Sequence, residues 1–284
     1  LDASLMNGVS EVWLKNMSTV SNSSDETVTV SNLAKTAAIG IKGGDKTTGI
    51  VAATGGDLAV TFAGAGSTDT QNVKLSDANI AKLTLATAET VAIDATGASV
   101  IADLRDTAVK TLNVTGAGSV KLSAVTKAVG TTSDTLATIN ASANTGGVTI
   151  GSATALDQAV TKTVTGGSGN DAFYVANIFA DATAAAKYDG GAGTDTLGVD
   201  TLTTLTTANA AIVNAVKNFE TIEFTNTSVT AIQTNLLTGI NNFVFNNTGT
   251  NLAITGLETA DTITIKADHT GATGNAAIDF SGAV

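Results

Sequence analysis

Two glycine-rich turns in the second half of the chain carry the residues best suited to bind a ligand. Paired glycines adopt backbone conformations closed to other residues, so several carbonyl oxygens can point inward, and an aspartate in the sixth place adds negative charge. Ca²⁺ prefers such an oxygen shell, so the pattern predicts calcium turns, although glycine and aspartate also form ordinary surface turns. The two turns read Gly166-Gly167-Ser168-Gly169-Asn170-Asp171 and Gly190-Gly191-Ala192-Gly193-Thr194-Asp195.

The spacing of these turns predicts how they are arranged. Asp195 lies 24 residues after Asp171 (195 − 171), so the two turns can stack if the insertion between Ile178 and Lys187 loops out. A third, degenerate turn at residues 64–69 lacks the leading glycine pair and ends in Asp69, which is a further candidate ligand. Scattered aspartates such as Asp45, Asp57 and Asp77 leave room for other calcium sites.

The elements that must position these turns are short strands. Segments of about four to six residues alternate apolar residues with threonine or other polar residues and are separated by Gly, Asn, Ser and Asp, which is typical of strands. Related apolar positions recur from one segment to a later one at intervals that predict stacked coils. We therefore expect an all-β, elongated parallel β-helix or β-solenoid, with a β-sandwich as the alternative. The intervals between related apolar positions run from Leu83 to Leu112, from Leu112 to Ile139, from Ile222 to Phe243, and from Phe243 to Ile263.

Minor helical decorations are expected at two corners of the solenoid. Residues 207–217 combine a threonine cap with Ile212, Val213 and Val216, and residues 181–187 form the second candidate. The chain divides by composition into a Thr/Ala/Gly-rich solenoid region at 1–160 and a region with the calcium turns at 161–284, or it forms one continuous domain 1–284. At about 4.8 Å per coil, the rod would be on the order of 50 Å long.

Composition narrows the class of protein. The net charge is −11, which argues against nucleic acid and anionic membranes as partners, because both would repel the chain. Cysteine and proline are absent, so bound calcium rather than a disulfide framework is expected to stabilise the fold outside a cell. The sequence starts at Leu1 without a signal peptide and has no apolar run long enough to span a bilayer, so we expect no membrane insertion.

Catalytic constellations are not evident, and we expect a protein that is not an enzyme. His269 is the single histidine, which excludes a His-Glu-x-x-His zinc site. Arg105 is the only arginine and lies between Asp103 and Asp106, where a solvated ion pair is expected. A remote alternative is a calcium-dependent polysaccharide lyase that uses Arg105 as its base. Threonines two apart, as at Thr27 and Thr29, are interpreted as ordinary strand residues rather than an ice-binding face.

The chain resembles an RTX-type surface-layer (S-layer) protein of Gram-negative bacteria. Both turns match the Gly-Gly-x-Gly-x-Asp repeat of RTX proteins. The resemblance covers about 60 residues, from Val164 to Thr225. Its residues are the first turn with its tail Ala172-Phe173-Tyr174-Val175, the second turn from Tyr188 to Leu197, and Asn218-Phe219-Glu220-Thr221-Ile222-Glu223-Phe224.

This resemblance implies a function. Asp171 and Asp195 would share one Ca²⁺ between stacked turns, the chain would leave the cell by type I secretion, and it would fold on meeting extracellular calcium. It would then self-assemble into a two-dimensional lattice on the bacterial cell surface, with lipopolysaccharide or another surface glycan as anchor. The alternative is a secreted RTX adhesin or glycan-binding module, which recognises another surface rather than copies of itself.

Overall fold

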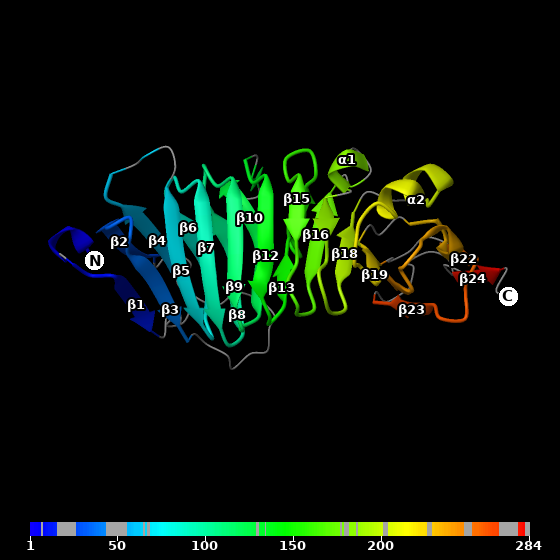
Figure 1. Cartoon of the computed structure of the whole chain (residues 1–284), viewed down its shortest axis with the longest axis horizontal. Helices are drawn as coiled ribbons and strands as arrows, with labels where there is room; N and C mark the ends of the chain where they lie inside the picture. The colour runs from blue at the N-terminus through cyan, green and yellow to red at the C-terminus, as the bar shows by residue number, and fades with distance from the viewer. Residues whose placement is uncertain are drawn as a thin grey trace, which may run out of the picture.

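The chain forms an elongated parallel β-solenoid, which confirms the predicted fold class (Figure 1). In the computed structural model, the described residues are 1–6, 8–15, 27–43, 56–64, 66, 69–128, 131–133, 135–176, 178, 182–185, 187–200, 204–225, 229–246, 252–266 and 278–281. Successive coils stack along the long axis, with the two termini at opposite ends. Each coil contributes one strand to each of two facing sheets, and a third sheet joins near the C-terminal end.

The first sheet carries every second strand of the N-terminal two thirds of the chain. Its strands, in spatial order, are β1 (Glu11–Lys15), β3 (Ala38–Lys42), β5 (Thr70–Ser76), β7 (Thr90–Thr96), β9 (Thr111–Gly116), β12 (Thr138–Asn144), β15 (Thr163–Thr165) and β17 (Tyr188–Asp189).

The second sheet runs along nearly the whole described chain. Its main path is β2 (Thr27–Leu33), β4 (Asp57–Phe62), β6 (Asn79–Leu85), β8 (Ser99–Arg105), β10 (Val120–Ala128), β13 (Val148–Ile150), β16 (Ala172–Ala176), β18 (Thr196–Val199), β19 (Thr221–Phe224), β21 (Asn242–Phe245) and β23 (Thr262–Ile265). Beside it, β11 (Thr131–Thr132) pairs with β10, and β14 (Leu156–Asp157) pairs with β16. The third sheet is β20 (Ala231–Gln233), β22 (Leu252–Thr255) and β24 (Ile278–Ser281).

Strand register tests the predicted spacings directly. Leu112 pairs with Ile139, and Phe243 lies between Ile222 and Ile263, as the sequence predicted. The predicted spacing from Leu83 to Leu112 is wrong. Leu83 lies in the second sheet and pairs with Leu104, whereas Leu112 belongs to the first sheet. Both sheets also continue across residue 160, since β12 pairs with β15 and β13 pairs with β16.

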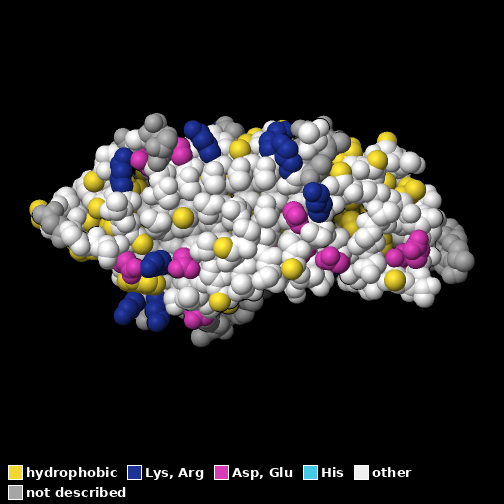
Figure 2. Space-filling model, viewed as in Figure 1, with side chains coloured by type: hydrophobic (Ala, Val, Ile, Leu, Met, Phe, Trp, Pro, Cys, Tyr) yellow, Lys and Arg dark blue, Asp and Glu magenta, His cyan; other side chains and the backbone are white. Residues whose placement is uncertain are grey.

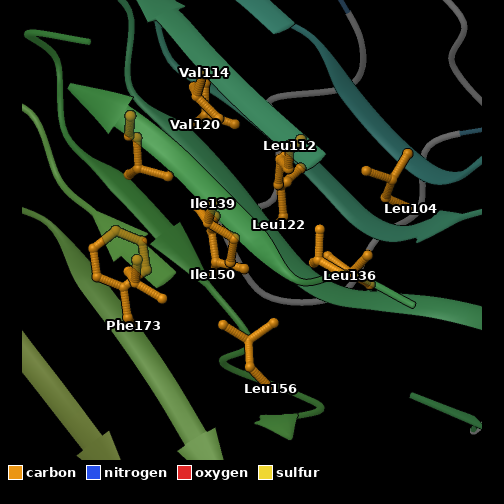
Figure 3. Close-up of a cluster of buried hydrophobic side chains, with 14 of the residues drawn as sticks. Leu104, Leu112, Val114, Val120, Leu122, Leu136, Ile139, Ile150, Leu156 and Phe173 are labelled. Carbon is orange, nitrogen blue, oxygen red and sulfur yellow. The ribbon is translucent and has the colours of Figure 1, made fainter. Parts of the chain in front are cut away.

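The hydrophobic core fills the space between the facing sheets (Figure 3). Strand alternation turns every second side chain inward, so Leu112 and Ile139 from the first sheet share the core with Leu122 and Ile150 from the second. Each is fully buried and contributes about 1.5–3 kcal/mol through the loss of water contact. Toward the C-terminal end, Phe224 and Phe245 stack with ring centroids 5.0 Å apart, so aromatic rungs replace aliphatic ones.

The outer face of the first sheet carries a column of threonines. Parallel pairing in register places Thr70, Thr90, Thr111, Thr138 and Thr163 on successive rungs. Strand alternation directs all five outward, where they are partly or fully exposed. The result is a regular polar surface.

Two kinds of connection link the sheets at opposite edges of the solenoid. The turn edge runs from the first sheet to the second and includes residues 116–119, 144–147, 166–171, 190–195 and 218–220. The helix edge runs back from the second sheet to the first and carries α1 (Ala182–Ala185) and α2 (Thr207–Val213), which confirms the predicted helical decorations. Thr206 caps α2, whose last residue comes four before the predicted end at Lys217. Two 3₁₀ turns, η1 (Ala3–Leu5) and η3 (Thr234–Leu236), lie toward the two ends of the chain.

Candidate calcium site

The two glycine-rich turns stack directly on each other at the turn edge. The first joins β15 to β16 and the second joins β17 to β18, and Ala172 pairs with Thr196 just after them. The N–H of Ala192 donates to the carbonyl of Gly167 at 2.9 Å, which links one turn to the other. The insertion between them includes α1 and lies at the opposite edge, so the condition for stacking is met.

Close stacking explains why these turns are rich in glycine. A Cβ atom on Gly167 would lie 2.0 Å from the carbonyl oxygen of Asn144, and one on Gly166 would lie 1.8 Å from that of Gly190. Gly191 and Gly193 also have φ values of 97° and 132°, in the region that side chains avoid. The backbone geometry therefore requires glycine before any ion is considered. The exposed third positions, Ser168 and Ala192, escape this crowding.

The aspartates of the two turns belong to a ladder of acidic side chains. The N–H of Val148 donates to Asp171 Oδ1 at 2.6 Å, and the N–H of Asp171 donates to Asp195 Oδ1 at 2.7 Å. The N–H of Asp195 in turn donates to Glu220 Oε2 at 2.9 Å. Each acidic side chain thus reaches back by one coil and satisfies a backbone donor. Asp171 and Asp195 are fully buried.

The electrostatic environment differs between the two aspartates. Burial raises the pKa of Asp171, while hydrogen bonds from the N–H groups of Gly167 and Val148 oppose that rise. Burial raises the pKa of Asp195 to about 6, and the negative charges of Asp171, Glu220 and Asp189 add to the shift. Only the N–H of Asp171 opposes it. Asp195 is therefore the carboxylate with the greater need for a positive partner.

One buried oxygen at this site has no hydrogen-bond partner, namely Asp195 Oδ2. Leaving a buried polar atom unpaired is costly, and a buried carboxylate oxygen is a hard ligand of the kind that Ca²⁺ binds. The chemistry of the site therefore fits a calcium ion held by Asp195, Asp171 and turn carbonyls. Among the described residues, no group of three or more His, Cys, Asp or Glu side chains is placed to hold a metal, so backbone oxygens would have to complete the shell.

The third predicted ligand is not brought to this site. Asp69 precedes β5 at the helix edge, where its Oδ1 accepts a hydrogen bond from Lys35 Nζ at 2.8 Å and its Oδ2 accepts one from the N–H of Gly66 at 2.6 Å. The bond from Lys35 lowers the pKa of Asp69. Its charge is thus already compensated. Asp57 pairs with Lys82, Asp77 lies at the turn edge near Gly97, and Asp45 and His269 fall outside the described residues.

Sequence reasoning missed three side chains of the turn edge. Glu220 ends the ladder, and Asp189 accepts hydrogen bonds from Gly191 N–H at 3.1 Å and Asn218 Nδ2 at 2.7 Å. Asn144 is buried one coil earlier, where its amide donates to the carbonyls of Gly116 and Gly118 at 3.0 and 2.9 Å. A neutral amide therefore fills that turn from inside. Glu220 follows Asp195 by 25 residues (220 − 195), so continuing the coil spacing would have found it.

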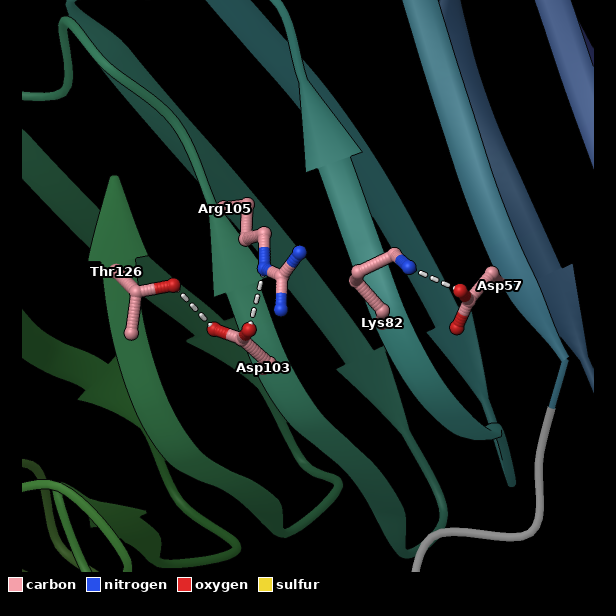
Figure 4. Close-up of polar contacts among 5 residues, drawn as sticks. All are labelled: Asp57, Lys82, Asp103, Arg105 and Thr126. Atoms are coloured by element: carbon pink, nitrogen blue, oxygen red, sulfur yellow. Dashed lines mark hydrogen bonds and ion pairs between the residues drawn. The ribbon is translucent and has the colours of Figure 1, made fainter. Parts of the chain in front are cut away.

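Arg105 lies on the outer face of the second sheet, away from the turn edge (Figure 4). Its Nε donates to Asp103 Oδ2 at 2.5 Å, and Asp103 Oδ1 also accepts a hydrogen bond from Thr126 Oγ1 at 2.6 Å. The neighbouring Lys82 pairs with Asp57 on the same face. Register places Asp57, Lys82 and Asp103 on consecutive rungs, so their charges alternate along the axis.

Comparisons with known proteins do not assign the chain to a family. The chain matches no protein-family model, and no curated protein or solved structure is significantly similar to it. Within the described residues, the helices are too short to cross a membrane.

Proposed function

We propose that this chain is a calcium-dependent structural protein of a bacterial surface layer, which assembles with copies of itself into a two-dimensional lattice on the cell exterior. The observation that carries the proposal is the buried, unpartnered Oδ2 of Asp195 within a ladder of acidic side chains. Stacked turns of the Gly-Gly-x-Gly-x-Asp type place that oxygen beside Asp171 and Glu220. A cation at this oxygen would offset the cost of burying these charges at neutral pH.

The ladder gives calcium a means to control folding. Asp195 and Asp171, with carbonyl oxygens of the turns at 166–171 and 190–195, would hold the ion, and its charge would offset the cost of burying two carboxylates. Because the site exists only when the coils are stacked, binding stabilises the folded state by mass action. The chain would remain weakly folded at the low calcium of a cytoplasm and fold outside the cell after type I secretion.

The faces of the solenoid support lattice formation. The threonine column from Thr70 to Thr163 gives the first sheet a regular polar surface that a second copy can contact. The net charge of −11 makes copies repel one another at low ionic strength. Calcium would therefore act twice, by stiffening each solenoid and by reducing the repulsion between neighbours.

The test is electron microscopy of the purified chain at millimolar calcium and again after chelation, with light scattering alongside. We expect ordered sheets with calcium and dispersed particles without it. Asp195→Asn should lose most of the calcium dependence of sheet formation, because it removes the charge at the unpartnered oxygen. Monodisperse rods in both conditions would contradict the lattice, and a free energy of unfolding that is the same with and without calcium would contradict the coupling of folding to the ion.

A further inference from the structure

Trp13 lies flat against the outer face of the first sheet at the N-terminal end of the solenoid. It pairs in register with Gly40 of β3, and a Cβ atom on Gly40 would lie 2.3 Å from Trp13 Cδ2. The indole therefore covers the glycine with one face, and the side of the residue away from the sheet is open, since Trp13 is 39% exposed. It is the only tryptophan in the chain.

Polar contacts hold the ring in this orientation. Trp13 Nε1 donates to Glu11 Oε2 at 2.8 Å, and the other oxygen of Glu11 pairs with Lys74. Lys74 lies opposite Gly40 on the next rung of the sheet. The ring is therefore fixed before any ligand arrives, which reduces the entropy cost of binding to it.

Covering a glycine is a structural role in itself, and the second sheet contains a comparison. Tyr174 lies over Gly198 in the same manner, and its hydroxyl donates to Glu223 at 3.0 Å. Tyr174, however, is only partly exposed, whereas Trp13 is among the few exposed large hydrophobic residues described. Stabilising a sheet does not require that exposure.

The surroundings of Trp13 carry a local excess of positive charge. Lys15 and Lys42 are paired in register, each two residues beyond Trp13 and Gly40, and both are exposed. Neither forms an ion pair with another described residue. In a chain with 14 basic and 25 acidic residues, two lysines that have no ion-pair partner among the described residues, next to the one tryptophan, favour an anionic ligand.

A shallow depression begins beside Glu11, the hydrogen-bond partner of Trp13, and crosses the neighbouring strands of the sheet. Ala38 and Ala92 contribute small side chains to its lining, and Glu11, Asn72, Lys74 and Asp94 contribute polar or charged groups. Figure 2 shows acidic and basic side chains bordering a hydrophobic patch near the N-terminal end of this face. An aromatic platform, lysines and a polar groove thus lie side by side over adjacent strands.

We propose that this surface binds an acidic polysaccharide, with a uronic acid ring packed on Trp13. The C–H face of a pyranose carries partial positive charge and complements the negative face of an indole. The sugar carboxylate would contact Lys15 and Lys42, whose Cα atoms lie about 6.6 Å along the strands from those of Trp13 and Gly40. The next sugar would enter the groove beside Asn72. This binding function goes beyond the proposed lattice and does not depend on it.

Fluorescence provides a direct test, because Trp13 is the only tryptophan. The chain is titrated with trigalacturonate, which is too short to gel, at fixed calcium. We expect a saturable change in tryptophan emission that weakens with added salt, and a much weaker response to cellotriose. An unchanged emission with trigalacturonate, together with no heat in calorimetry, would overturn the proposal, as would equal binding of the neutral sugar.

Calorimetry on variants separates binding from folding. Trp13→Ala and Lys15→Gln/Lys42→Gln should each weaken binding by about tenfold, whereas Trp13→Phe keeps a ring over Gly40 and should retain most of the affinity. Lys110→Gln/Lys121→Gln makes the same charge change elsewhere and should bind as the wild type does. Equal weakening in that control would assign the effect to net charge and overturn the site. Circular dichroism of each variant checks that it folds.

Discussion

The backbone N–H of Asp171 donates a hydrogen bond to the side chain of Asp195 at 2.7 Å, so the two aspartates of the glycine-rich turns are joined across one coil. This bond occupies Oδ1 of Asp195 and leaves Oδ2 buried without a partner. The same carboxylate thus links the two turns and holds the unpaired buried oxygen, which makes Asp195 the most informative residue to change.

Asp195→Asn should stabilise the calcium-free protein and abolish its response to calcium. An amide keeps an oxygen for the N–H of Asp171 while removing a buried charge that has three acidic neighbours. In the wild type, calcium at about a hundred times its dissociation constant should add about 2.7 kcal/mol to the free energy of unfolding. Thermal unfolding followed by circular dichroism, with and without calcium, measures both effects.

Asp69→Asn is the matched control for that experiment. Asp69 lies at the helix edge and already pairs with Lys35, so the variant should lose a small amount of stability and keep the calcium response of the wild type. A calcium response that disappears in Asp69→Asn, or that persists in Asp195→Asn, would place the ion elsewhere.

The calcium-free protein should become more stable as the pH falls from 7 to 5. Asp195 and Asp106 both have pKa values raised from the ordinary value of 3.8 to about 6, chiefly by burial. Between these values the folded state binds more protons than the unfolded state, so stability increases as the pH falls through about 6 and this gain ends near the unfolded pKa. Urea unfolding across this range measures the slope.

Calcium should remove the Asp195 part of this pH dependence, because a cation favours the charged carboxylate. Asp106→Asn should remove the other part, since Asp106 is buried at the helix edge and accepts hydrogen bonds from the N–H groups of Ala88 and Ala108. A calcium-free protein that steadily loses stability as the pH falls from 7 to 5 would contradict the assignment.

Gly167→Ala should destabilise the fold by about 3 kcal/mol through overpacking, because its Cβ atom would lie 2.0 Å from a backbone oxygen. Gly239→Ala is the comparison: its φ of 78° is strained for alanine, but no atom lies within 4 Å of the new Cβ, so a loss of about 1 kcal/mol is expected. Chemical denaturation of both variants at saturating calcium gives the difference. Equal losses would show that the turns are not closely stacked.

Arg105→Gln should change stability by no more than about 1 kcal/mol, because its ion pair with Asp103 is partly exposed. We also expect neither the wild type nor the variant to release unsaturated sugars from polygalacturonate or alginate, as measured by ultraviolet absorbance. Turnover by the wild type that the variant lacks would support the lyase interpretation instead.

The sequence predicted the class of fold because solenoid coils repeat simple signals. Strand alternation marked inward residues, and the spacing between Asp171 and Asp195 placed two turns on one edge. Spacing could not predict every strand pair, because the number of residues between paired positions varies from coil to coil. The step from Thr70 to its partner Thr90 is much shorter than the step from Ala38 to its partner Asn72. Loops of different length alter the step without altering the strands, so spacing alone predicts Leu112 as the partner of Leu83, whereas the structure pairs Leu83 with Leu104.

The candidate site was predictable in its turns and not in its side-chain network. Glycines and aspartates in a fixed pattern identify a turn, but the ladder to Glu220 depends on which backbone donor each carboxylate reaches. The same limit applies to Asp69, whose turn resembles the others while its partner is Lys35 from an earlier coil. The residues around Trp13 in the sequence do not indicate that its ring covers a glycine, because that glycine, Gly40, belongs to the next coil.

The change of sheets near β19 has a mechanical consequence. The first sheet ends with a single bridge from Asp189 to Lys217, and the third begins with one from Thr204 to Ala231. Between these coils, the only continuous ladder among the described strands runs from Thr196–Thr221 to Val199–Phe224 in the second sheet. A tensile load along the axis therefore passes through one sheet there and through two sheets in most earlier coils. Stretching should open the solenoid first between β18 and β19, directly beside the turn that contains Asp195.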